Sequence, residues 1–100
     1  MYRDVKITLQ QVAYAIQDGV EIGTVTAESQ VWAKHRTATR AEFYAAEKDG
    51  HKVTDAFVVF AFEFSGQQRL TCEGQTYKIV RVYRDELDTV ELNCERLVKA

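Results

Sequence analysis

The stretch DAFVVFAFEF, residues 55–64, is apolar at every position except Asp55 and Glu63. Valine and phenylalanine favour extended backbone, and the stretch has an ordinary length for a strand. A strand that is apolar on both faces needs cover on each of them, so it lies in the middle of a sheet or meets another subunit. The sequence therefore predicts a central strand over residues 55–64, which Ser65-Gly66 ends.

The N-terminal region has the pattern of a half-buried strand. Residues 4–9 alternate between apolar and polar, with Val5, Ile7 and Leu9 on one face. A period of two residues is typical of a strand with one face on the core. The alternation breaks at residues 10–11, which indicates a bulge or the end of the strand.

Residues 12–29 have a weaker pattern that leaves two alternatives open. Asp18-Gly19 is a signal for a two-residue turn, which would make the segment an exposed hairpin. Without such pairing the segment is a mobile loop. Either way its length makes it a candidate working surface.

Three further segments read as strands. Residues 30–37 alternate, which places Val31, Ala33 and His35 on one face and Trp32, Lys34 and Arg36 on the other. Residues 70–72 and 75–83 predict a hairpin around Glu73-Gly74, because glycine tolerates the positive φ of a tight turn. Residues 89–95 also fit helical spacing, but we favour a strand, since Val90 is β-branched and the hairpin needs a neighbour.

One short helix interrupts the strands. In RTATRAEFYAAE, residues 36–47, Thr39 and Glu42 have the spacing of a capping box, and the alanines favour helix. Asp49-Gly50 supplies the end of the helix. Phe43 would dock on the sheet, and Tyr44 would face outward.

Size and composition indicate one soluble globular domain. The chain has 100 residues, 46% of them hydrophobic and 28% charged, with no proline and a net charge of −2. This size predicts a single core, and the charge gives the chain as a whole no reason to coat DNA or an anionic membrane. Neither an apolar run long enough to span a bilayer nor a signal peptide is expected. Cys72 and Cys94 are expected to be small buried side chains rather than a disulfide.

The predicted fold class is mainly β: a small antiparallel β-barrel or curled sheet of five to six strands with one short α-helix. Residues 1–100 would form one such domain, with the long loop or hairpin at about residues 12–29. Nearly all connections are short enough for antiparallel neighbours.

No constellation of catalytic or metal-binding residues is evident. His35, His51, Cys72 and Cys94 lack the close pairs that zinc sites use, and the sequence has no glycine-rich phosphate loop. The cysteines lie in apolar alternation, which favours inert packing over nucleophilic chemistry. We therefore expect no enzyme activity, no cofactor and no metal.

Nucleic-acid contact has a weak case. Trp32, Lys34 and Arg36 share a strand face, where they could stack a base and pair with phosphates. We favour the alternative in which Trp32 belongs to the core and the cations form a solvated rim. The predicted hairpin carries a similar combination of aromatic and basic side chains, with Tyr77 and Tyr83 beside neighbouring cations.

Three blocks of the sequence together resemble the phage head closure family, also called head–tail joining or stopper proteins. They are the N-terminal strand RDVKITL (residues 3–9), the segment from Trp32 through TRAEFYAA (residues 39–46), and the hairpin CEGQTYKIVR (residues 72–81). The resemblance implies a structural virion protein of the head–tail connector. Such a protein closes the portal channel after DNA packaging and provides the docking surface for the tail.

The resemblance also implies partners and a location. We expect a homo-oligomeric ring of twelve-fold symmetry matching the portal, with adaptor or portal proteins above it, tail proteins below it and no membrane contact. The protein would be found in the virion, and in the host cytoplasm before assembly. Double-stranded DNA would meet the channel transiently and without sequence specificity.

Two sets of site residues follow as hypotheses. Lys34, Arg36 and Arg40 would face the DNA in the lumen, carried by residues 34–47, with residues 13–29 as the alternative lumen segment. Phe43, Tyr44, Phe60 and Phe62 would contact other subunits or partners. Two other functions remain open: a tail completion or terminator protein, and a small barrel that binds single-stranded nucleic acid.

Overall fold

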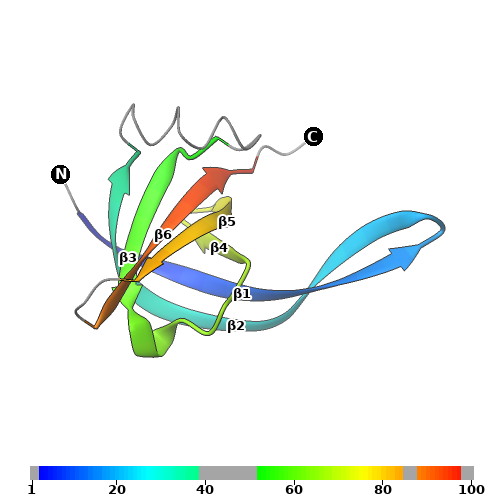
Figure 1. The fold of residues 1–100 in the computed structure, drawn as a ribbon, viewed down its shortest axis with the longest axis horizontal. Helices are drawn as coiled ribbons and strands as arrows, with labels where there is room; N and C mark the ends of the chain where they lie inside the picture. The colour runs from blue at the N-terminus through cyan, green and yellow to red at the C-terminus, as the bar shows by residue number, and fades with distance from the viewer. Residues whose placement is uncertain (1–2, 39–51, 85–87, 98–100) are drawn as a thin grey trace.

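A computed structural model of the chain describes residues 3–38, 52–84 and 88–97 (Figure 1). Six strands and one 3-10 turn account for most of them. The strands are β1 Arg3–Gln17, β2 Val20–Thr37, β3 Asp55–Phe60, β4 Arg69–Cys72, β5 Gln75–Arg84 and β6 Thr89–Arg96, and the 3-10 turn η1 is Ala61–Glu63. The predicted helix, including Arg40, Phe43 and Tyr44, lies outside the described residues. In the described part, no helix is long and apolar enough to cross a membrane.

The six strands close into an antiparallel barrel in the order β1-β2-β3-β6-β5-β4. β4 completes the ring by pairing with residues Thr8 to Gln10 of β1. Closure pairs the edges that an open sheet would leave exposed. The mainly β prediction is confirmed, and of its two forms the barrel is the one observed.

The core is formed by the inward positions of the strands. Its fully buried members include Ile7, Leu9, Phe57, Val59, Leu70, Val90, Leu92 and Cys94. The alternation predicted for residues 4–9 is confirmed, because Val5, Ile7 and Leu9 all lie in this cluster. Cys72 and Cys94 are both buried and free, as predicted.

A bulge redirects β1 where the sequence alternation breaks. The β1–β2 register shifts between Gln11 and Val12, so that Gln11 faces Ala27 while Val12 faces Val25. β1 and β2 then continue beyond the barrel as a two-stranded hairpin, which projects to one side in Figure 1. Of the two alternatives left open for residues 12–29, the exposed hairpin is the one observed.

Both predicted tight turns are present. Asp18 and Gly19 have φ values of 53° and 79°, and Glu73 and Gly74 have 51° and 80°. Two successive positive φ values are the geometry that suits the twist of a two-residue hairpin. The Glu73-Gly74 turn joins β4 to β5, and β6 pairs with β5 as the last strand, as predicted.

The predicted strand over residues 55–64 is too long. β3 ends at Phe60, and the chain turns through η1 before Phe64 returns to the core. Ala61 donates its backbone N–H to the carbonyl of Asp88, which anchors the turn beside the start of β6. Phe60 and Phe62 therefore do not continue a strand face with Val58 and Phe64.

Candidate partner-binding surface

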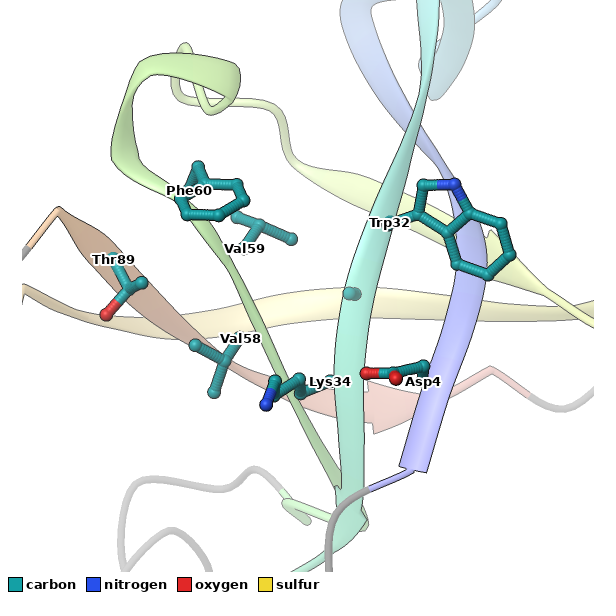
Figure 2. Close-up of a pocket in the computed structure, with 8 residues that line it drawn as sticks. Asp4, Trp32, Lys34, Val58, Val59, Phe60 and Thr89 are labelled. Carbon is teal, nitrogen blue, oxygen red and sulfur yellow. The ribbon is translucent and has the colours of Figure 1, made fainter.

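A groove opens where β2 and β3 separate. These strands pair from Lys34 to Thr37 on β2 and from Asp55 to Val58 on β3. Beyond that point β2 runs toward the projecting hairpin and β3 turns into η1, as Figure 2 shows. The hollow between them, which we call the fork groove, has a volume of about 250 Å³ and is lined by Asp4, Trp32, Ala33, Lys34, Val58, Val59, Phe60 and Thr89.

Exposed aromatic side chains form the rim of the fork groove. Trp32 is 65% exposed on one side and Phe60 is 52% exposed on the other. Phe62, 81% exposed, stacks on Phe60 with ring centroids 5.6 Å apart. Large aromatic side chains left in water around an apolar hollow are typical of a protein interaction site.

The predicted position of Trp32 in the core is wrong. β2 follows the predicted alternation, with Val31 and Ala33 buried, and Trp32 therefore shares the outward face with Lys34. The core face was identified correctly. The error lay in assuming that Trp32, which lies on the opposite face, would also be covered by other side chains.

Lys34 and Arg36 have different surroundings on that outward face. Lys34 is exposed and lines the fork groove. Arg36 is mostly buried and forms an ion pair with Glu91 of β6, across the intervening β3. The two predicted lumen residues on β2 are therefore near each other, but Arg36 already contributes to the barrel wall. Arg40, the third, lies outside the described residues.

The predicted contact residues Phe60 and Phe62 do come together at the fork groove. Their stacking depends on η1, since two consecutive outward positions of a regular strand would hold the rings side by side along the sheet. Phe43 and Tyr44 lie outside the described residues. The sequence analysis found the two aromatics but not the groove that they border.

The hairpin beyond the bulge is a second exposed apolar feature. We call residues 13–24 the arm; all of them are exposed. Ile16 is 76% exposed and Val20 is 60% exposed, close to the Asp18-Gly19 tip. The sequence suggested a working surface here by its length alone, and its weak alternation gave no sign that apolar side chains would remain in water.

Tyr14 shields the backbone of the opposite arm strand. A Cβ added at Gly23 would lie 2.9 Å from Cε1 of Tyr14 and 3.1 Å from Cγ1 of Val12. Gly23 pairs with Tyr14 in the register, so the aromatic ring occupies the space above the glycine. Such a pair stiffens a hairpin that has no third strand beside it.

A buried polar pair lies on the inner side of β2 and β3. Nε2 of His35 is 2.7 Å from Oδ1 of Asp55, and the His35 ring lies 4.8 Å from the Phe57 ring. Arg96 Nη2 is 3.8 Å from Oδ2 of the same carboxylate. The pair faces the barrel interior and does not reach the fork groove, so we assign it to the stability of the barrel.

The two cysteines and Tyr77 are covered, whereas Trp32 and Tyr83, the other candidates for base stacking, are exposed. Burial raises the pKa of the Cys94 thiol far above its ordinary value, and it also raises the pKa of Cys72. Tyr77 is buried with its ring edge-on to Phe57 at 5.2 Å, so it cannot stack on a base. Across residues 3–38, 52–84 and 88–97, no three histidine, cysteine, aspartate or glutamate side chains lie together as a metal site would require.

Comparison with known protein families gives a match, which covers nearly all residues of the barrel. A family model described as phage head completion protein matches residues 4–96 of this chain. A comparison with curated proteins found no match. The family match includes β2 through β6 entirely and all of β1 except Arg3.

Proposed function

Because this chain belongs to the phage head completion protein family, whose members are structural virion proteins acting in head assembly, we propose that it closes the portal channel after DNA packaging and provides the docking surface for the tail. The observation that carries this proposal is the pair of exposed apolar features, the arm and the fork groove. Exposed apolar side chains gathered on two separate parts of the surface favour an assembled state in which they are covered.

The proposed assembly is a ring of copies of this chain, with portal or adaptor proteins above and tail proteins below. Rings follow when one surface of a subunit binds a different surface of the next and the rotation closes. The protein would occupy the head–tail connector of the virion, and the host cytoplasm before assembly. Its role would be structural, which the burial and raised pKa of the Cys94 thiol support.

We assign the lumen to the Lys34 side rather than to the arm. Residues 13–24 carry Asp18 and Glu21 and no lysine, arginine or histidine, so DNA phosphates would repel the arm. Lys34 is exposed, whereas Arg36, two residues further along the same face, is held by its ion pair with Glu91. Lys34 would meet DNA through its phosphates, without sequence readout.

Deletion of the gene from the phage or prophage that carries it tests this function. After induction, electron microscopy of the lysate should show full or leaking heads beside finished, unattached tails. A plasmid copy of the gene should restore joined particles, which controls for effects on neighbouring genes. Intact virions in the deletion lysate would contradict the proposal, and aberrant tails would instead favour a tail completion or terminator role.

A further inference from the structure

The arm and the fork groove belong to the same chain but cannot meet within it. Both lie on β2, with Val20 beside the arm tip and Trp32 on the rim of the groove. These positions are twelve residue steps apart, which corresponds to about 40 Å of extended strand. The overall dimensions of 44 × 30 × 26 Å agree with an arm held away from the barrel.

We propose that the arm of one copy seats in the fork groove of the next copy. This inference rests on the proposed function, because it specifies how the subunits of the ring engage. A contact between two different surfaces of one chain is heterologous, and it closes into a ring when the rotation between copies permits. The occupant of the groove is therefore a second copy of this chain.

The exposed apolar side chains of the two surfaces match. Near its tip the arm offers two aliphatic side chains, Ile16 on one face and Val20 on the opposite face, since Ile16 pairs with Glu21 and Val20 with Gln17. The fork groove has an apolar floor that includes Val58 and Val59, between the rings of Trp32 and Phe60. Aliphatic side chains inserted between two aromatic walls would remove apolar surface of both partners from water.

The backbone at the fork also suits an extended partner. β3 pairs with β2 only from Lys34 to Thr37. The part of β2 that precedes Lys34 therefore has no strand neighbour, among the described residues, on the edge that would continue toward β3. Exposed edges accept an added strand through main-chain hydrogen bonds. A hairpin arm has two outer edges that can make this pairing.

Charge favours a protein surface over DNA as the partner of the arm. The arm carries the carboxylates of Asp18 and Glu21 with no cation among residues 13–24. The two charged residues that line the groove, Lys34 and Asp4, face each other and offset each other, so the groove does not repel an acidic tip.

The arm is long enough to reach a neighbour. From Ala13 to Gln17 it projects by about 17 Å beyond the bulge. The two shorter dimensions of the molecule are 30 and 26 Å, so a copy packed beside the barrel lies within reach of the tip. An isolated two-stranded hairpin is marginally stable in water. Binding in the groove of a neighbour would also stabilise the arm, because it would bury the arm's exposed apolar side chains.

Cysteine cross-linking in assembled particles tests the contact. In phage carrying Ile16→Cys together with Phe60→Cys, oxidation should convert the protein from a monomer band into a ladder of dimers and higher species. The native thiols are buried and should not contribute. A matched control pairs Ile16→Cys with Tyr83→Cys, because Tyr83 is 52% exposed like Phe60 but does not line the groove.

The outcomes separate this inference from the proposed function. Joined, infectious particles that contain the protein but give no more cross-linking than the Tyr83 control would overturn the arm contact and leave head closure standing. Absence of the wild-type protein from purified particles would overturn both. If the double variant fails to assemble, a photo-reactive benzoylphenylalanine at position 16 alone replaces it. Its cross-link should map to the peptide with Trp32 or Phe60, and capture of DNA or another virion protein would overturn the proposal.

Discussion

The imidazole of His35 and the carboxylate of Asp55 form a polar pair on the inner side of the barrel, with Nε2 and Oδ1 2.7 Å apart. Asp55 is almost completely buried, and 13% of the His35 side chain is exposed. Breaking a buried polar pair costs more than the pair itself contributes, since the remaining partner stays desolvated and unpaired.

We expect Asp55→Ala and His35→Ala each to lower the free energy of unfolding by about 2–4 kcal/mol. The double variant Asp55→Leu with His35→Phe should lose less than the sum, because it removes both polar groups and keeps an aromatic ring against Phe57. Urea denaturation followed by circular dichroism measures all of these values. Single variants that change stability by less than about 0.5 kcal/mol would show that the pair is energetically neutral.

The ion pair between Arg36 and Glu91 joins β2 to β6 across β3. Its side chains are 17% and 27% exposed, so Arg36→Ala should cost about 1–2 kcal/mol of stability. Arg36→Glu should cost more, because two carboxylates would face each other, and Glu91→Arg in the same chain should recover part of the loss. The measurement is a double-mutant cycle in urea, and additive effects would contradict a direct coupling.

Lys34 is a sharper probe of DNA contact than Arg36, since it is exposed and its substitution should leave the barrel intact. Lys34→Glu should reduce the amount of DNase-protected DNA in purified heads, and Lys78→Glu on the exposed part of β5 is the matched control. If Asp18→Lys repairs the Lys34→Glu defect, Lys34 acts through the arm of a neighbour and the lumen assignment is wrong.

The two thiols should be unreactive in the folded protein. Burial raises the pKa of Cys72 and Cys94, which keeps both in the thiol form that does not attack disulfide reagents. Labelling with Ellman's reagent at neutral pH should be slow in buffer and rapid for two thiols in denaturant. Because the folded pKa values are raised, stability should fall as the pH rises above the ordinary thiol value of about 8.5. Rapid labelling of the native protein would contradict the buried assignment.

The arm should be dispensable for the stability of the barrel. Deleting residues 13–17 and 20–24 joins Val12 to Val25 through Asp18-Gly19, and these two valines already pair. Since residues 13–24 are all exposed, the melting temperature should change little. The shortened protein should nevertheless fail to restore joined particles to the deletion phage. A large loss of stability would show that the arm supports the barrel, and full complementation would show that the arm has no role in assembly.

Local sequence patterns predicted the parts of the fold that depend on neighbouring residues. The alternation of Val5, Ile7 and Leu9 identified the core face of β1, and its break located the bulge between Gln11 and Val12. Glycine and aspartate marked the tip of the arm, because a two-residue hairpin requires positive φ there. These features need no knowledge of distant contacts.

Features set by distant contacts could not be predicted. The end of β3 at Phe60 depends on the bond from Ala61 to Asp88, and no proline or glycine marks it in the sequence. Trp32 lies in water because β2 and β3 separate beside it, which its own alternation cannot reveal. The pairing of His35 with Asp55 likewise depends on the β2–β3 register.

Reconstitution in vitro tests head closure most directly. Heads from the deletion lysate would be incubated with the purified protein and then with purified tails, and plaque-forming units would be counted. We predict that the wild-type protein restores infectivity, and that the order of addition matters because the protein must bind the heads before the tails can dock. No infectivity from this mixture, under conditions where heads from a plasmid-complemented lysate join the same tails, would contradict the account.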